Sequence, residues 1–431
     1  MTPRTVALTT LGCKTNQFES VAMQQRLQEA GYQVVDFAAG ADLVIVNTCT
    51  VTAATDAQSR NLIRRARRLN PDCQVVVTGC YAQIDPQALA ALPEVSLVLG
   101  NEEKADFLRH LEDDASPRVV VSPIREIRRA AVPVVGNAAE RSRAFVQIQN
   151  GCDAFCSYCI IPYARGASRS VLLPQVVEQV RTLFDAGYPE VVLTGIHIGG
   201  YGLDVQPATT LTALIEQLLP LPDGVRLRLG SLEPTEVPDT LLDLFAAQTQ
   251  ICPHLHIPLQ SGCDTVLARM NRTYDTAFFA ALLQRVVARL PDVAIGLDVI
   301  VGFPGESEAE FTATVDFLEA LPFSHLHVFP FSRRPGTPAA SMPGQVPGDV
   351  IKKRAAHLRT LGSRKLQSYA ARFIGRELDL VVESGGRGRE QRGLSANYLS
   401  VRFSGDPDRA GHLQRVRVVG VAGEQLLAEP L

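Results

Sequence analysis

The sequence predicts an α/β protein with three successive domains: a parallel sheet covered by helices, an incomplete α/β barrel and a small all-β module. Three observations support this prediction. Short apolar runs alternate with helical patterns through about the first 120 of the 431 residues, the alternation restarts at Ala144, and about the last 60 residues read as short strands separated by turns. A chain of this length is too long for one hydrophobic core, which agrees with several domains.

The first domain, residues 1–121, reads as a series of βαβ units. Its strand candidates are VALTTLGC, DLVIVNTC and QVVVTGC, and its helix candidates are FESVAMQQRLQEAG and DAQSRNLIRRARRLN. This alternation predicts a parallel sheet that is buried on both faces. Residues 122–143, SPIREIRRAAVPVVGNAAERSR, mix arginine with proline and break the rhythm, so we predict a linker there.

The second domain, residues 144–365, contains six strand candidates: AFVQIQNG, EVVLTGIHIGG, RLRLGSLEP, HLHIPLQSG, VAIGLDVIVGFPG and HLHVFPFS. Helical stretches separate most of them, so the domain has six strand–helix units, two fewer than a complete barrel. Functional groups of such barrels lie at the carboxyl ends of the strands. The strand ends here are polar or rich in glycine: His197, Glu233, Gln260, Asp298 and Gly302–Glu306.

The third domain, residues 366–431, carries the strand candidates ELDLVVES, GLSANYLSVRF and QRVRVVGVAGEQLLAE. We predict a small all-β module from them. A helix rich in lysine and arginine precedes and enters it, between Lys352 and Arg372.

Composition narrows the class of protein. A hydrophobic content of 46% and a charged content of 20% are typical of soluble globular proteins. The net charge of −3 gives no global sign of nucleic-acid binding, so any basic surface must be local. The start of the chain lacks a signal-peptide pattern, and no segment approaches about 18 uninterrupted apolar residues. We therefore expect a cytoplasmic protein without a membrane partner. In such a protein we interpret the nine cysteines as metal ligands or reactive thiols in preference to disulfides.

Three cysteines crowd the stretch NGCDAFCSYCIIPYARG: Cys152, Cys156 and Cys159. A structural zinc site needs a fourth ligand, but no His or Cys follows Cys159 until His197. A disulfide would use two thiols and leave the third unused. Three thiolates leave one coordination position of a metal centre open, and an open position indicates chemistry.

A second set of cysteines comes from three different strands of the first domain. Cys13, Cys49 and Cys80 each end a strand candidate, and the carboxyl ends of neighbouring parallel strands lie side by side about 4.8 Å apart. Three loops at one edge can therefore bring these thiols together. The alternative is that each is a small buried residue, as free cysteines often are. Cys73 begins its strand and should lie about 20 Å away, so we exclude it.

These two cysteine sets carry a resemblance to a known family. The C-x3-C-x2-C spacing, with Tyr158 before the last cysteine, resembles the signature of radical S-adenosylmethionine (SAM) enzymes. The set of Cys13, Cys49 and Cys80 resembles the methylthiotransferase branch, and the all-β tail resembles the RNA-binding TRAM module. Five segments are similar to the enzymes that act on N6-threonylcarbamoyladenosine in tRNA: LGCKTNQFES, NTCTVTAATDAQSR, TGCYAQ, LGNEEK and CSYCIIPYARG.

The resemblance implies a methylthio transfer to C2 of the modified adenine at position 37 of tRNA. It implies two [4Fe–4S] clusters, one on the catalytic Cys152, Cys156 and Cys159 and an auxiliary one on Cys13, Cys49 and Cys80, with two SAM molecules as cofactor and methyl source. It also implies three partners: the tRNA anticodon stem–loop, a reductant such as flavodoxin or ferredoxin, and a sulfur donor. The residues expected to bind SAM are Tyr158, Gly195, Glu233, Gly302 and Glu306.

Each SAM contact has a plainer alternative: packing beside the cluster for Tyr158, turn geometry for the glycines, and a structural ion pair for Glu233. Arg165 and Arg169 could meet a carboxylate or phosphate, or form a solvated pair. Other candidates for RNA contact lie on two basic helices and in the tail: Arg60, Arg64, Arg65, Arg67, Arg68, the helix Lys352–Arg372, Arg387, Arg389, Arg392, Arg402 and, by stacking, Tyr398. We interpret six further residues as packing or surface groups: His254, His256, His325, His327, Cys252 and Cys263.

Two other functions stay open at this point. One is a radical SAM methylthiotransferase of another substrate, either isopentenyladenosine in tRNA or a ribosomal protein. The other is a non-catalytic iron–sulfur protein that binds RNA or senses iron. Analysis of modified nucleosides in tRNA and of the mass of ribosomal proteins would separate the three.

Overall fold

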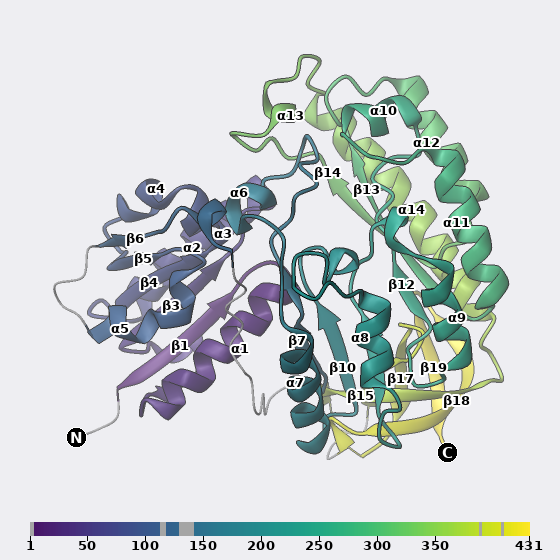
Figure 1. The fold of residues 1–431 in the computed structure, drawn as a ribbon, viewed down its shortest axis with the longest axis horizontal. Coiled ribbons are helices and arrows are strands. Elements are labelled where there is room, and N and C mark those ends of the chain that lie inside the picture. Colours follow the sequence, from purple (N-terminus) through teal and green to yellow (C-terminus); the bar gives the residue numbers. More distant parts are fainter. Residues whose placement is uncertain (1–3, 113–117, 129–141, 388–389, 407–408) are drawn as a thin grey trace. The chain divides into compact units, whose positions relative to one another are not determined.

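The fold is described by a computed structural model that covers residues 4–112, 118–128, 142–387, 390–406 and 409–431 (Figure 1). The chain divides into two compact units, and each is described by itself. The first unit comprises residues 1–138, 147–172 and 332–340, and the second comprises residues 139–146, 173–331 and 341–431. Most of the predicted linker, residues 129–141, lies outside the described residues. The boundaries of the three domains remain a proposal.

The first unit contains the predicted parallel sheet, which has six strands in the order β2-β1-β3-β4-β5-β6. All of its strand pairs are parallel. The strands are β1 (Thr5–Thr10), β2 (Gln33–Val34), β3 (Leu43–Thr48), β4 (Gln74–Gly79), β5 (Leu97–Leu99) and β6 (Val119–Val120). The helices between them are α1 (Lys14–Glu29), α2 (Ala53–Leu69), α3 (Cys80–Ile84), α4 (Pro86–Ala90) and α5 (Phe107–Glu112).

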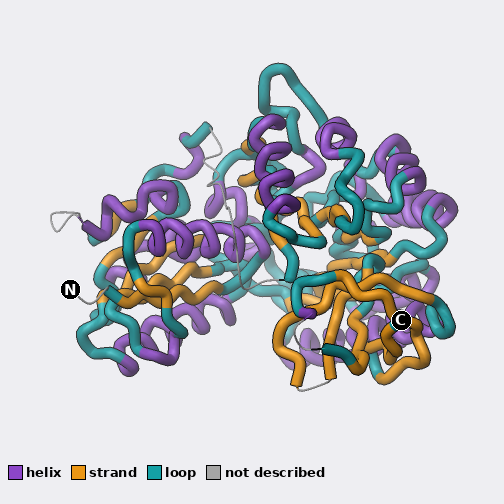
Figure 2. Tube along the Cα trace, turned by 90° about the horizontal axis from the view of Figure 1, so that it is seen from below, coloured by secondary structure: helices purple, strands orange, loops and turns teal. Residues whose placement is uncertain are grey.

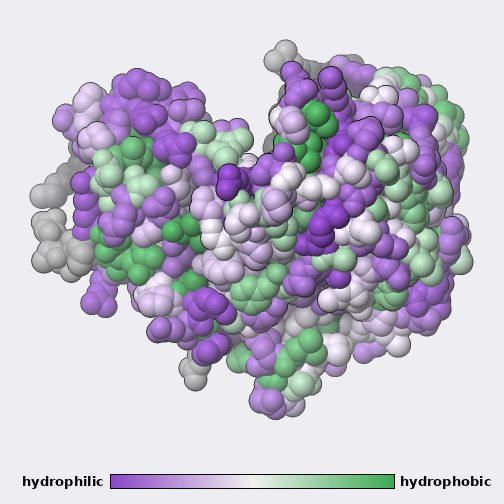
Figure 3. All heavy atoms as spheres, turned by 90° about the horizontal axis from the view of Figure 1, so that it is seen from above, coloured by the Kyte–Doolittle hydropathy of each residue, from purple (hydrophilic) through white to green (hydrophobic). Residues whose placement is uncertain are grey.

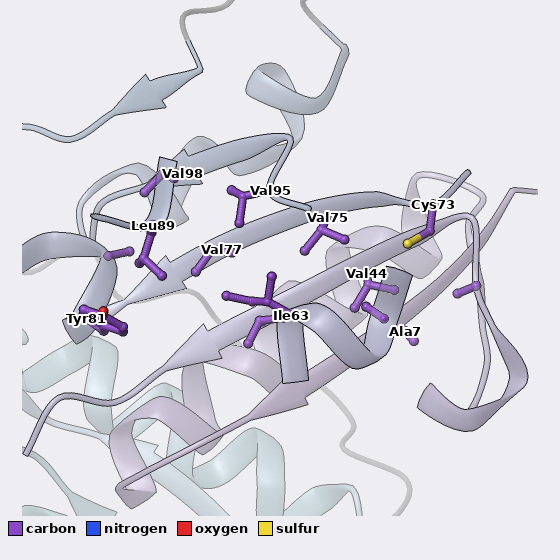
Figure 4. Packing of buried hydrophobic residues seen from close by; sticks show 14 residues of the cluster. Ala7, Val44, Ile63, Cys73, Val75, Val77, Tyr81, Leu89, Val95 and Val98 are labelled. Atoms are coloured by element: carbon purple, nitrogen blue, oxygen red, sulfur yellow. The ribbon is translucent and has the colours of Figure 1, made fainter. Parts of the chain in front are cut away.

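Alternation of side chains along the strands builds a core on each face of this sheet. On one face Val44 and Val77 pack with Ile63 of α2, and on the other Ile45 packs with Leu27 of α1. Figure 4 shows the first of these clusters, with Cys73 and Tyr81 at opposite ends. Cys73 is thus a core residue at the start of β4, far from the carboxyl end where Cys80 begins α3.

The second unit holds two three-stranded sheets with the predicted alternation of strands and helices. One sheet has the order β11-β10-β7 and the other β12-β13-β14, and isolated parallel bridges link the region of β11 to that of β12. The strands are β7 (Ala144–Gln147), β10 (Glu190–Thr194), β11 (Arg226–Leu229), β12 (His254–His256), β13 (Ala294–Val301) and β14 (His325–Pro330). The helices that follow them are α7 (Leu173–Asp185), α8 (Leu211–Leu218), α9 (Asp239–Ala247), α11 (Thr276–Arg289), α12 (Glu308–Ala320) and α14 (Gly348–Ala371), with the short α10 (Asp264–Arg269) between them. The short α13 (Pro338–Ser341) belongs to the first unit except for its last residue. The six predicted strand–helix units are confirmed.

The end of the chain forms a closed barrel with the strand order β15-β16-β17-β19-β18, which confirms the predicted all-β module (Figure 2). Its strands are β15 (Glu377–Arg387), β16 (Glu390–Ser395), β17 (Ser400–Ser404), β18 (Leu413–Ala422) and β19 (Gln425–Pro430). Helix α14 contributes Tyr369 to the core of this barrel, and Phe373 just beyond the helix joins it there.

A buried ion-pair network joins β10, β11 and the closed barrel within the second unit. Glu190 accepts hydrogen bonds from Arg226 Nε at 2.6 Å and from Arg228 Nε at 2.7 Å. The two guanidinium groups also donate to backbone carbonyls of the barrel, namely those of Asp379, Leu394, Ser395 and Ala396. Burial opposes ionisation of Glu190, but the charges of Arg228 and Arg226 outweigh it and lower its pKa to about 2.

Hydrophilic residues, drawn in purple, mix with smaller hydrophobic groups on the face of the protein shown in Figure 3. Within the described parts of the chain, no helix combines the length and the apolar character that crossing a membrane requires.

We expect Glu190→Gln to destabilise the second unit by about 3–5 kcal/mol, because two buried guanidinium groups lose their counter-charge. Folding lowers the pKa of Glu190 from 4.5, so the ionised carboxylate stabilises the fold fully above about pH 4.5. That contribution is lost as the pH falls toward 2. Denaturant unfolding at several pH values should therefore show the difference between wild type and variant shrinking below pH 4.5. The exposed Glu216→Gln serves as the control, and an equal loss of stability in both variants would contradict the assignment.

Candidate metal centre

The loop with Cys152, Cys156 and Cys159 is closed at its base by a short hairpin. It leaves β8 (Gln149–Asn150), enters α6 (Ile161–Arg165) and continues into β9 (Arg169–Ser170), which pairs antiparallel with β8. The backbone nitrogen of Cys152 donates to the carbonyl of Gly166 at 3.0 Å, and that of Cys159 donates to the carbonyl of Cys156 at 2.9 Å. The three thiols are therefore presented by one tight, internally bonded loop.

A glycine makes this closure possible. Gly151 has a φ of 76°, and a Cβ at this position would lie 1.9 Å from the carbonyl oxygen of Ala167. No other residue fits there without moving the backbone. Within the loop, Cys156 is buried, whereas Cys152 and Cys159 are half-buried.

The second cysteine set gathers at the carboxyl edge of the parallel sheet. Cys13 caps the start of α1, Cys49 follows β3, and Cys80 starts α3 directly after β4. The ends of the strands are in register, because Thr10 pairs with Asn47 and Thr48 pairs with Gly79. A Cβ on Gly12 would lie 2.7 Å from Cys49 Sγ, which shows how closely the first loop passes the second.

The electrostatics of this set suit a positively charged metal group. Burial, together with the neighbouring Cys80 and Cys13, raises the pKa of the Cys49 thiol to about 11. Three free thiols therefore converge where thiolates would repel one another unless a cation joins them. Iron–sulfur clusters are held by such deprotonated cysteines, so the donor set fits a cluster with three protein ligands.

A buried arginine connects the two cysteine sets inside the first unit. Arg165 ends α6, six residues after Cys159, and its Nε donates to Cys80 Sγ at 3.3 Å. The guanidinium forms an ion pair with Glu19 and a hydrogen bond with Asn16 Oδ1, and its side chain is fully buried. The sequence left open whether Arg165 contacts a carboxylate or phosphate or forms a solvated pair. The structure shows a contact with the carboxylate of Glu19 and no exposure of the Arg165 side chain.

Glu19 and Lys104 complete this network. Lys104 Nζ also donates to Glu19, and both residues are buried. Burial opposes the ionisation of Glu19, but the charges of Arg165 and Lys104 lower its pKa to about 2. Sequence reasoning missed Asn16 and Glu19. Their spacing could have indicated that they are buried, because Asn16, Glu19 and Met23 lie on one face of α1 at helical spacing.

The residues expected to bind SAM lie in different local settings. Tyr158 is half-buried in the first cysteine loop, and Gly195 follows β10 directly. Glu233 forms an ion pair with Arg272, which is the structural alternative weighed for it. We keep the SAM-binding role of these residues as a proposal.

Gly302 and Glu306 form a rigid turn after β13. Glu306 Oε2 accepts from the backbone nitrogens of Gly302 at 2.7 Å and Phe303 at 3.1 Å, while its other oxygen accepts from Arg354 of α14. A Cβ on Gly302 would lie 2.3 Å from Ile351, so the glycine also lets α14 pack closely. The carboxylate thus holds the shape of this loop.

The basic candidates divide into engaged and exposed groups. Arg169 is buried and donates to the carbonyls of Arg165 and Ala167. Arg60 donates to the hydroxyl of Tyr81, and Arg354 is paired with Glu306. The exposed members are Arg64, Arg65, Arg68, Lys352, Lys353, Arg359, Arg364, Arg372 and Arg392. Arg389 lies outside the described residues, as does the side chain of Arg387.

The proposed stacking of Tyr398 on an RNA base was wrong. Its ring stacks on His254 with centroids 4.2 Å apart, and the guanidinium of Arg228 lies 5.1 Å from its centre. The ring is therefore engaged inside the second unit, where Tyr398 also packs against the barrel core. The alternative of a core residue holds.

Two family models match the chain. Residues 5–100 match the model described as "Uncharacterized protein family UPF0004", and residues 146–318 match the radical SAM superfamily. The first match covers the sheet with Cys13, Cys49 and Cys80, and the second covers Cys152, Cys156 and Cys159.

Relatives of known name align along nearly the whole chain. The threonylcarbamoyladenosine tRNA methylthiotransferase MtaB of Bacillus subtilis is 41% identical over 96% of this chain and 94% of the relative. That of Aquifex aeolicus is 40% identical over 96% of this chain and 100% of the relative. The tRNA-2-methylthio-N(6)-dimethylallyladenosine synthase of Cereibacter sphaeroides is 33% identical over 99% of both chains.

Solved structures support the fold. The radical S-adenosylmethionine methyltransferase TsrM from Kitasatospora setae, determined with cobalamin and a [4Fe-4S] cluster, has a TM-score of 0.57. The match covers 78% of this chain and 77% of that one at 20% identity, so it concerns the fold alone.

Gly151→Ala should weaken iron binding by the first cysteine set, because the added methyl group collides with the Ala167 carbonyl. We expect about eight irons per chain in anaerobically reconstituted wild type and about four in the variant, by the cysteine-ligation rule. Iron and sulfide assays measure this. Gly348→Ala, at a position with open space around it, should retain the wild-type count. A full iron complement in Gly151→Ala would show that the loop tolerates the clash.

Proposed function

Because this chain belongs to the family of threonylcarbamoyladenosine tRNA methylthiotransferases, we propose that it replaces the C2 hydrogen of N6-threonylcarbamoyladenosine at position 37 of tRNA with a methylthio group. The carrying observation is 41% identity along 96% of the chain. Five relatives with that activity are 35–41% identical, whereas those named for dimethylallyladenosine are 30–33% identical. The order of these identities favours the threonylcarbamoyl substrate.

The two cysteine sets divide the work in this proposal. Cys152, Cys156 and Cys159 hold the cluster that binds SAM, and Cys13, Cys49 and Cys80 hold the auxiliary cluster. When bound, these clusters and SAM supply the radical that removes the C2 hydrogen, the sulfur that replaces it and the methyl group that caps the sulfur. Each set offers three thiolates, which leaves one position for SAM or for sulfur.

The residues around the clusters hold them in place and keep water out. The hairpin of β8 and β9 fixes the first loop, and buried Arg165 donates to Cys80 Sγ. Tyr158, Gly195, Glu233, Gly302 and Glu306 are our candidates for binding SAM. Within the second unit, Glu306 and Arg354 stiffen the turn that contains Gly302.

Contact with the tRNA anticodon stem–loop is assigned to exposed basic side chains. Lys352, Lys353 and Arg359 line α14 at its solvent-facing positions, and Arg392 is exposed on the closed barrel. Such groups suit phosphate contacts, which position an RNA without reading its sequence. The chemistry also needs an electron donor, such as flavodoxin or ferredoxin, and a sulfur donor.

Nucleoside analysis of tRNA tests this function. A strain that lacks the gene should lose 2-methylthio-N6-threonylcarbamoyladenosine and regain it when the wild-type gene is restored. If the methylthio derivative of dimethylallyladenosine disappears instead, the substrate assignment is wrong. A mass change on a ribosomal protein with unchanged nucleosides would support the protein-modifying alternative, and no change in either would support a non-catalytic iron–sulfur protein.

Cys49→Ala should separate the two cluster roles. With the radical cluster intact, the variant should still cleave SAM reductively to 5′-deoxyadenosine, but it should form no methylthio product. Cys156→Ala should abolish both, because it removes a ligand of the SAM-binding cluster. Liquid chromatography of 5′-deoxyadenosine and of the RNA product measures the two outputs. Equal loss of 5′-deoxyadenosine in both variants would disprove the division.

A further inference from the structure

Three side chains from neighbouring strands converge at one point of the second unit. His256 ends β12, Asp298 lies in β13, and His327 lies in β14. Asp298 Oδ1 is 2.9 Å from His256 Nε2 and 3.0 Å from His327 Nδ1. All three ligand atoms lie within 4.8 Å of one another. None of these residues belongs to either cysteine set.

The strand register explains the convergence. His256 is the cross-strand partner of Gly296, and His327 is the partner of Asp298. Gly296 and Asp298 are two residues apart, so they point to the same face of the sheet. Ile295, Leu297 and Val299 of the same strand are buried on the opposite face, at 0–1% exposure. The three ligand side chains thus share the other face.

Two further contacts shape the site. Ser231 Oγ lies 2.6 Å from His256 Nδ1, which fixes the orientation of the ring and leaves Nε2 directed at Asp298. A Cβ on Gly296 would lie 2.9 Å from the His256 ring, so this glycine leaves room for the imidazole. A hydrogen bond to the second ring nitrogen is the usual partner of a metal-binding histidine.

We propose that His256, Asp298 and His327 bind a divalent first-row transition-metal ion. Two imidazoles and one carboxylate form a donor set that suits Zn²⁺, Fe²⁺ or Mn²⁺ and leaves other coordination positions open. Ligand atoms about 2.1 Å from a common ion lie about 3 Å apart, which is the separation of Asp298 Oδ1 from each of the two histidine nitrogens. All three ligands lie on strands of one sheet or at a strand end, and His327 is the most exposed of them.

The exposure of the three side chains supports an accessible site. His256 is 15% exposed, Asp298 is 20% exposed, and His327 is 53% exposed. The inner ligands are thus largely shielded from water, while the outer one leaves a route for an ion and for a further oxygen ligand. The centroids of the two imidazole rings lie 5.4 Å apart.

Mn²⁺ is the probe for this site, because it prefers nitrogen and oxygen ligands to the thiolates that hold the clusters. Reconstituted holoprotein with oxidised, diamagnetic clusters is titrated with Mn²⁺, and the loss of the free-ion electron paramagnetic resonance signal gives the bound fraction. We expect about one Mn²⁺ per chain, released by one equivalent of Zn²⁺, which follows Mn²⁺ in the affinity order of divalent ions. Iron content is followed in parallel to show that the clusters stay loaded.

Graded variants distinguish a metal site from a structural ion pair. Asp298→Asn and His327→Gln should abolish Mn²⁺ binding, and Ser231→Ala should weaken it about 10- to 100-fold through loss of the orienting hydrogen bond. His412→Gln, at an exposed histidine of the closed barrel, should bind like wild type. His327 is half exposed, so its variant should fold even if Asp298→Asn does not. Absence of Mn²⁺ binding in wild type, or equal binding by His327→Gln, would overturn the proposal.

Discussion

The buried guanidinium of Arg165 is the constraint on which the arrangement of the cysteines depends. A charge at 0% exposure must be compensated within the protein, and Arg165 finds its partners in the carboxylate of Glu19 and the sulfur of Cys80. Because Arg165 ends the helix that follows Cys159, these contacts hold the first cysteine loop next to the edge of the parallel sheet. Two thiol sets that are far apart in sequence are thereby set in one unit by one side chain.

Grouping the thiols has an electrostatic cost, but it also fixes the positions of the ligands. Burial, together with the neighbouring Cys80 and Cys13, raises the pKa of Cys49, so a thiolate at this position needs positive charge nearby. Arg165, which donates to Cys80 Sγ, brings one positive charge to this group of thiols. In the proposed function, iron supplies the remaining positive charge. The protein around the cysteines is therefore organised for clusters before they bind, with strand ends, a glycine-closed loop and a buried ion pair each fixing one part. Such preorganised ligands reduce what must be ordered when a cluster forms.

Local patterns predicted most of the fold and the positions of Cys13, Cys49 and Cys80 at the strand ends, because strand periodicity is a property of short segments. Cys49 and Cys80 follow β-branched runs that are typical of buried strands. The short strands of the tail were recognisable from the turns between them. Contacts over long sequence distances were beyond that reasoning. Glu19 and Arg165 are 146 residues apart, and nothing local indicates that a polar position of α1 will meet an arginine from the cysteine loop. Tyr398 was misread for the same reason, because its partner His254 lies on a distant strand.

The four histidines of β12 and β14 show how depth along one face decides the role of a side chain. His254 and His325 lie two residues before His256 and His327 on their strands, so all four share a face. The rings of His254 and His325, the first histidine of each strand, both contact the ring of Tyr398. Burial lowers the pKa of His325 to about 4, which keeps it neutral. Two residues further along, His327 is exposed to water, and the carboxylate of Asp298 contacts both His256 and His327. The same residue type is thus a packing group at one level and a ligand candidate 6–7 Å further along the strand, at about 3.3 Å per residue. The sequence alone shows only that the histidines alternate; the neighbours that separate their roles come from β13 and from the closed barrel.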